Sequence, residues 1–161
     1  MAYIDTMTGL GNRTVFLEEN KSNAIFPGMI SYIMMDANNL KTINDTLGHN
    51  KGDELIITIA KCMRKAVGHN GQCYRIGGDE FVIILKNKTA AETEEIINKV
   101  RCEIEFADKQ SDITISVAIG YVWTDTEQKN LEDLMQHADD EMYQDKKKTK
   151  ENKSKENTHS I

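Results

Sequence analysis

The sequence predicts an α+β fold, a ferredoxin-like βαββαβ core with additional helices at the N- and C-terminal ends. Two observations predict it. After a short first helix, apolar spacings of three and four alternate with runs of β-formers, in the order strand, helix, strand, strand, helix, strand, helix. The pair Gly77-Gly78 separates the second and third β-rich runs, and glycine tolerates the positive φ angles of a tight hairpin.

The first half of the chain supplies two helices and one strand. Asn12 can cap a helix over about 13–24. The apolar run 29–35 is typical of a buried strand, and it ends at Asp36. Over 49–67, apolar residues recur at the spacing of one helix face.

The second half supplies the remaining three strands and two helices. Strands are expected at about 72–76 and 80–86, on either side of the glycine pair. A helix over about 90–107 follows, and strict alternation over 113–121 indicates another strand. The apolar positions of 131–146 predict a last helix.

The composition indicates one cytoplasmic globular domain. The chain has 161 residues, of which 39% are hydrophobic, a length that suits a single core. Its N-terminus lacks the features of a signal peptide, and no apolar run approaches the roughly 20 residues of a membrane segment. The three cysteines form no CxxC pair, so neither a disulfide framework nor a zinc site is indicated.

The charge is unevenly distributed. The net charge is −6, yet residues 146–161 hold six lysines against two glutamates. The rest of the chain is acidic and would repel nucleic-acid backbones, which excludes a nucleic-acid partner. We expect a catalytic domain over 1–148 and a disordered, lysine-rich tail over 149–161.

Three carboxylates are expected at one edge of the predicted sheet. The third strand of such a core lies between the first and second and is antiparallel to both, so Asp36 should meet Asp79 and Glu80. Acids this close repel unless a cation lies among them. One or two carboxylates together with substrate phosphates are the usual ligands of Mg²⁺. The acids therefore indicate a nucleoside triphosphate, although acids that merely solubilise a hairpin are the alternative for this motif alone.

The segment after Asp36 is predicted to be a polar loop with free backbone amides for phosphate oxygens. It is not an EF-hand, because with Asp36 at position one, Lys41 stands at the glycine position and Leu47 at the last ligand position. Asp53 falls in the first turns of the second long helix, where a purely structural interaction with the helix dipole is its alternative role.

Several motifs together resemble one family. They are DTMTGLGNR at the N-terminus, Asp36 followed by LKTIND, then GHNKGDE, RIGGDEF and the segment 116–120. In this order and spacing they strongly resemble the GGDEF domain of bacterial diguanylate cyclases, over about residues 5–150. The resemblance implies a fold like the catalytic palm of nucleotidyl cyclases. It also implies the condensation of two GTP molecules into cyclic di-GMP, with release of two pyrophosphates.

The resemblance also implies roles for individual residues. Asp36, Asp79, Glu80 and the carbonyl of Ala37 would hold Mg²⁺, with Mn²⁺ as an alternative, and Asp79 and Glu80 would be the catalytic pair. The other implied ligands contact GTP. Asn44 and Asp53 would bind guanine, whose N1–H and amino group suit a carboxylate, and the phosphates would be held by Lys41, Lys146, Lys150 and the backbone of Asn38, Asn39 and Leu40. Lys150 stands where the family has an arginine, which predicts a looser contact with the γ-phosphate.

The resemblance implies a transient homodimer that brings two GTP sites face to face, and an upstream sensory or receiver domain outside this chain. The family's inhibitory RxxD site is replaced here by GHNG at 68–71, which predicts weak or absent feedback through that site. Two other functions compete with the enzyme. One is a catalytically silent module that binds GTP or a cyclic dinucleotide, and the other is a structural dimerisation domain.

Overall fold

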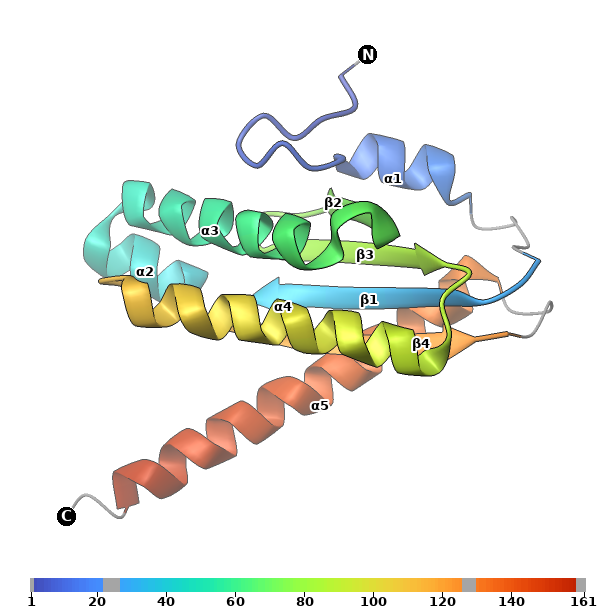
Figure 1. Cartoon of the computed structure of the whole chain (residues 1–161). Coiled ribbons are helices and arrows are strands. Elements are labelled where there is room, and N and C mark those ends of the chain that lie inside the picture. Colours follow the sequence, from blue (N-terminus) through green and yellow to red (C-terminus); the bar gives the residue numbers. More distant parts are fainter. Residues whose placement is uncertain (1, 22–26, 126–129, 159–161) are drawn as a thin grey trace.

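Four antiparallel strands form one sheet through the middle of the molecule (Figure 1). The computed structural model describes residues 2–21, 27–125 and 130–158. The strands are β1 (Ile30–Ala37), β2 (Gly71–Arg75), β3 (Glu80–Lys86) and β4 (Val117–Thr124). Their order is β2-β3-β1-β4, so the third strand lies between the first and second and is antiparallel to both, as predicted.

Helices cover both faces of the sheet. The helices are α1 (Arg13–Glu19), α2 (Leu40–Leu47), α3 (His49–Val67), α4 (Ala90–Gln110) and α5 (Leu131–Thr158), with a 3₁₀ turn η1 (Gly68–Asn70). Helices α3 and α4 pack on one face, α1 and α5 pack on the other, and α2 lies beyond the end of β1 (Figure 1). This is the predicted α+β architecture.

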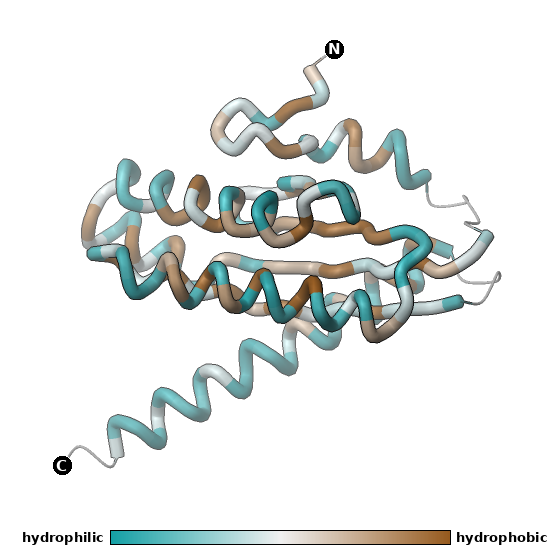
Figure 2. Tube along the Cα trace, in the orientation of Figure 1, coloured by the Kyte–Doolittle hydropathy of each residue, from teal (hydrophilic) through white to brown (hydrophobic). Residues whose placement is uncertain are grey.

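The alternation of side chains along the strands creates two cores. In β1, Ile33 and Met35 face α3 and α4, whereas Tyr32 and Met34 face α1 and α5. Figure 2 shows the hydrophobic residues along the sheet and on the inner sides of the helices. Because both faces of β1 are buried, its sequence is mostly apolar, apart from the buried residues Ser31 and Asp36.

Two predictions about the ends of elements were wrong. The predicted polar loop after β1 contains helix α2, because Asn39 adopts a left-handed conformation (φ 65°) that turns the chain, and Ile43 packs into the core. The predicted strand over 113–121 starts only at Val117, although Ile113 and Ile115 are buried. Their amides donate to side chains of the preceding segment instead of to a neighbouring strand.

The lysine-rich tail is also different from the expectation. Residues 149–158, predicted to be disordered, continue α5 as one helix through Thr158. Lysine and glutamate are good helix formers, and the first half of α5 is already fixed by packing on the sheet, so only propagation is needed. Figure 2 shows this second half as a hydrophilic helix that extends away from the sheet. In the described ranges, no helix is long and apolar enough to cross a membrane.

The first helix agrees with its prediction at the N-terminus. Asn12 caps α1 by accepting a hydrogen bond from the amide of Val15 at 3.0 Å. The helix ends at Glu19, and the predicted extension over 22–24 lies outside the described residues.

Gly120 allows α5 to approach β4 closely. A Cβ atom at this position would lie 2.1 Å from both the carbonyl oxygen of Ala138 and the amide nitrogen of Met142. Since these are backbone atoms of a helix, Gly120→Ala is expected to shift α5, together with Lys146 one turn further on, and to destabilise the fold by about 1–3 kcal/mol. Urea unfolding measures this change. Gly78→Ala, whose Cβ would meet nothing within 4 Å, is the control, and an unchanged midpoint for Gly120→Ala would contradict the prediction.

Candidate active site

Asp36 stands near the C-terminal end of β1, at the edge of the sheet that carries the predicted acids. It pairs with Glu80 of β3 and is only 7% exposed. Its Oδ2 atom accepts a hydrogen bond from the Nζ atom of Lys146 on α5. Its Oδ1 atom is buried and has no hydrogen-bond partner in the part of the chain that the structure describes. A buried carboxylate oxygen without a partner is costly, so this atom indicates a place where a ligand binds.

The surroundings of Asp36 disfavour its charge. Burial raises the pKa of this carboxyl to about 6, since the hydrogen bond from Lys146 only partly offsets the loss of water and the nearby Asp79 carboxylate raises the pKa further. A divalent cation between the two acids would remove both the repulsion and the cost of burial. The site is therefore built for a positive ligand.

The hairpin turn between β2 and β3 places Asp79 beside the end of β1. The amide of Ala37 donates to the carbonyl of Asp79 at 2.8 Å, which fixes the turn against β1. The Glu80 side chain instead folds back over the turn, where its Oε2 atom would be 2.9 Å from a Cβ built on Gly77. Within the described ranges, no three Asp, Glu, His or Cys side chains come together as a metal site. The three acids do meet at this edge of the sheet as predicted, since Asp36 pairs with Glu80 across the strands and Asp79 precedes Glu80, but their side chains do not gather into one cluster in the described ranges.

A pocket of about 280 Å³ opens beside this pair. Its walls come from the start of α2, from the hairpin turn and from the second half of α5, and its lining residues are Ala37, Asn38, Asn39, Leu40, Lys41, Asp79, Lys146, Thr149, Lys150 and Lys153. All the residues predicted to hold phosphates are among them. Lysines 146, 150 and 153 project from one face of α5, and Lys41 faces them from α2.

The backbone of α2 contributes free donors. The first hydrogen bond within this helix runs from the amide of Ile43 to the carbonyl of Asn39. The amides of Leu40 and Lys41 precede it and so have no partner within the helix, which makes the start of α2 suited to an anion. The amide of Asn38 is different from the expectation, because it donates to the carbonyl of Ser116 at 2.9 Å and is therefore not free.

Asn44 and Asp53, the predicted guanine ligands, come from different helices. A Cβ on Gly52 would lie 1.7 Å from the Oδ1 atom of Asn44, so the Asn44 side chain rests directly on Gly52, next to Asp53. A larger residue at position 52 would therefore displace the Asn44 side chain. Asp53 is exposed and Asn44 is half-buried, and neither lines the pocket beside Asp79.

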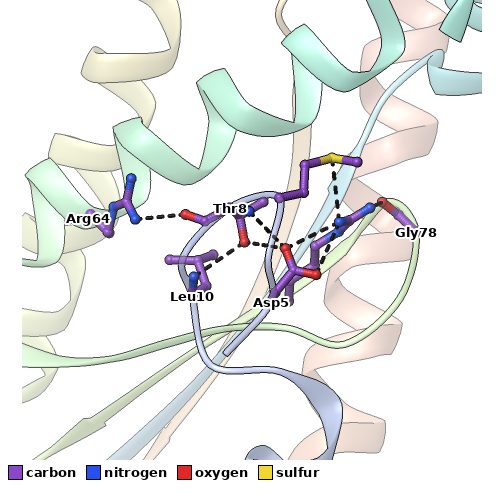
Figure 3. A network of polar contacts seen from close by, with 7 residues as sticks. Asp5, Thr8, Leu10, Arg64 and Gly78 are labelled. Atoms are coloured by element: carbon purple, nitrogen blue, oxygen red, sulfur yellow. Dashed lines mark hydrogen bonds and ion pairs between the residues drawn. The ribbon is translucent and has the colours of Figure 1, made fainter. Parts of the chain in front are cut away.

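The N-terminal motif supports the hairpin turn, a role that sequence reasoning did not assign. Asp5 accepts hydrogen bonds from the amide and hydroxyl of Thr8 at 2.9 and 2.6 Å. Arg75 pairs with Asp5 at 3.3 Å and donates to the carbonyl of Gly78 at 2.9 Å, and Arg64 donates to the carbonyl of Thr8 (Figure 3). Burial alone would raise the pKa of Asp5, but these hydrogen bonds and the positive charge of Arg75 lower it. The network ties the turn to the N-terminal loop, and an arginine two residues before the glycine pair was its signal in the sequence.

The chain matches the family described as "Diguanylate cyclase, GGDEF domain" over residues 2–152. It is 31% identical over 146 residues to the probable diguanylate cyclase DgcJ of Escherichia coli. The aligned region covers 88% of this chain and 29% of DgcJ. It is 34% identical over 159 residues to the signaling protein YkoW of Bacillus subtilis. This alignment covers 93% of this chain and 20% of YkoW. The chain therefore spans less than a third of either relative.

The fold is also similar to that of a solved GGDEF domain. The crystal structure of the GGDEF domain of DgcB from Caulobacter crescentus, in complex with c-di-GMP, superposes with a TM-score of 0.81 and 25% sequence identity over 91% of both chains. With a family match over nearly its whole length and a matching fold, this chain belongs to the GGDEF domain family of diguanylate cyclases.

Proposed function

We propose that this chain is an active diguanylate cyclase domain, which condenses two GTP molecules into cyclic di-GMP and two pyrophosphates across a homodimer. The observation that carries the proposal is the buried Oδ1 atom of Asp36, which has no hydrogen-bond partner among the residues that the structure describes. Asp36 lies beside Asp79, and Asp79 lines the lysine-rich pocket. Acids for a cation and lysines for phosphates are the two halves of a site for a metal-bound nucleoside triphosphate.

Magnesium fits the residues that are present. The carboxylates of Asp36 and Asp79 and the carbonyl of Ala37 are hard oxygen donors, and they would hold Mg²⁺ or Mn²⁺ together with the phosphates. Once bound, the ion would neutralise charge that develops on the phosphate and make the attacking hydroxyl more acidic. Glu80 follows Asp79 directly in the chain and would assist it with the proton.

The rest of the site would orient GTP. Lys41, Lys146, Lys150 and the amides at the start of α2 would bind the phosphates, and Asn44 with Asp53 would bind the guanine edge. Lys146 currently pairs with Asp36, so phosphate and cation binding would release it toward the phosphates. A carboxylate at Asp53 can accept from the N1–H and the amino group of guanine, and adenine offers no such pair.

The reaction would form a bond between the 3′-oxygen of one GTP and the α-phosphorus of the other. The bond from that phosphorus to the bridging oxygen breaks, pyrophosphate leaves, and the hydroxyl proton passes to Asp79 or Glu80. Two such steps close the ring. Because each domain would present one GTP, a second copy must supply the other. We place this domain in the cytoplasm, downstream of a sensory or receiver domain that brings two copies together.

The test is direct. Concentrated protein is incubated with GTP and Mg²⁺, and the nucleotides are separated by chromatography. Cyclic di-GMP should form with the native chain but not with the double variant Asp79→Ala, Glu80→Ala. Glu95→Ala, a change at an exposed acid of α4 away from the site, should leave the product unchanged.

A silent binding module is the second candidate, favoured by the ion pair that already neutralises Asp36 without a metal. It would bind GTP with Mg²⁺ yet form no product, even with two copies joined by a fused dimeriser. A structural dimerisation domain would bind no GTP at all.

A further inference from the structure

We propose that Lys153 of α5 binds the terminal phosphate of the nucleoside triphosphate, and that it gives the site its preference for a triphosphate over a diphosphate. The inference rests on the proposed function, because it concerns the same pocket. It adds a contact that lies in the part of the chain predicted to be disordered.

The geometry of α5 brings Lys153 into the pocket. Lys146, Lys150 and Lys153 are spaced by four and three residues, which places them on one face of the helix. With a rise of 1.5 Å per residue, Lys153 lies about 10 Å beyond Lys146 and about 4–5 Å beyond Lys150 along the axis. Helical side chains lean toward the N-terminus, so the Lys153 side chain points back over the turn that carries Lys150. All three line the same pocket.

The order of these lysines gives the pocket a direction. Lys146 contacts Asp36, where the cation and the reacting phosphate would lie. A triphosphate anchored there extends away from the acids along α5, first to Lys150 and then to Lys153. The phosphate furthest from the reacting atom is therefore the one that Lys153 can reach, and a diphosphate would end before it.

Charge leads to the same assignment. Lys146 lies beside Asp36, at the end of the pocket where the reacting phosphate would bind, and Lys150 lacks the two-pronged donor of an arginine. Among the described residues, Lys153 makes no ion pair, so its ammonium is available for a phosphate. An added ammonium favours the ligand with the larger negative charge.

A solvated helix end is the alternative for this lysine-rich segment, and the neighbouring lysines show the difference. Lys147 stacks on the Tyr143 ring, with its Nζ atom 4.7 Å from the ring centre, and Lys148 is exposed, as Lys153 is. Neither of them lines the pocket, whereas Lys153 does. The position of Lys153 therefore follows from helical spacing and not only from the richness of the segment in lysine.

The experiment compares two ligands by isothermal titration calorimetry with Mg²⁺. The triphosphate is a GTP analogue with an α,β-methylene bridge, which blocks the release of pyrophosphate, and the diphosphate is GDP. Lys153→Met should weaken analogue binding about fivefold to tenfold, as expected for loss of one charge-assisted contact, and leave GDP binding within about twofold. Lys153→Arg should bind the analogue like the native chain. Lys148→Met, the same change on another face of α5, should alter neither affinity.

Each other outcome overturns the assignment. Equal losses for both ligands would mean that Lys153→Met perturbs the pocket generally, and no loss for the analogue would mean that Lys153 is only solvated. Lys153→Gln, which keeps a polar side chain and a good helix former, must repeat the result. A different result would contradict the cyclase proposal alone. In that case the native chain binds the analogue, Lys153→Met weakens this binding, and the native chain forms no cyclic di-GMP from GTP. A native chain that binds neither nucleotide contradicts both proposals.

Discussion

Asp36→Asn should lower the formation of cyclic di-GMP about a thousandfold and, without metal near pH 7.5, should raise the melting temperature of the domain. The loss of activity follows because a bound metal supplies several kcal/mol of transition-state stabilisation, and about 4 kcal/mol corresponds to a thousandfold. The gain in stability follows from the same carboxylate, which is 7% exposed and keeps one oxygen without a partner in the described part of the chain. Function and stability are thus opposed at this residue.

The pH dependence of this effect has a definite sign. Burial raises the pKa of Asp36 to about 6 in the folded domain, above the value of about 3.9 expected for an unfolded chain. The folded state therefore favours the protonated acid. That contribution is complete below about pH 3.9 and is lost as the pH rises through about 6. At pH 7.5 the native chain carries the cost of a buried charge that an asparagine lacks.

Thermal unfolding with a chelator over this pH range measures the difference. The advantage of Asp36→Asn should be largest near pH 7.5 and should shrink as the pH falls toward 4. Added Mg²⁺ should stabilise the native chain and have little effect on the variant. Glu95→Gln, a change at an exposed acid of α4 beyond its first turn, is the control. A variant that melts below the native chain at pH 7.5 would show that the ion pair with Lys146 outweighs the burial cost.

The sequence was sufficient for the sheet and for one half of the site. A strict alternation and a glycine hairpin define which strands pair, and pairing of β1 with β3 brings Asp36 to Asp79 without any knowledge of side-chain contacts. The lysines that line the pocket were also named from the sequence, Lys41 from the polar segment after β1 and Lys146 from the resemblance to GGDEF domains. The pairing of the strands depends on topology, which period and order reveal.

The remaining features depend on tertiary contacts that no local pattern contains. Helix α2 forms because one asparagine takes a left-handed turn and one isoleucine reaches the core, in a segment that is polar on average. The Glu80 side chain lies over Gly77 because of its side-chain conformation, which the order of the strands does not determine. The extension of α5 depends on its packed first half, and with it Lys153 reaches the phosphate pocket.

A second large effect is expected on dilution. The acids Asp36 and Asp79 and the lysine-lined pocket lie together at one end of the sheet, and this arrangement would present one GTP per domain. The product requires two, so turnover per domain should fall about tenfold for each tenfold dilution once the dimer dissociates, by mass action.

Initial rates of cyclic di-GMP formation along a dilution series measure this dependence. A fused coiled-coil dimeriser should make the rate per domain independent of concentration, because the second site is then supplied at a high effective concentration. Excess Asp79→Ala protein should inhibit the unfused native chain, since mixed dimers lack one of the two acid pairs, whereas an equal excess of Glu95→Ala should not. A constant rate per domain for the unfused chain would instead require two GTP molecules on one copy. The lysines beside the single acid pair would then have to bind the phosphates of both GTP molecules.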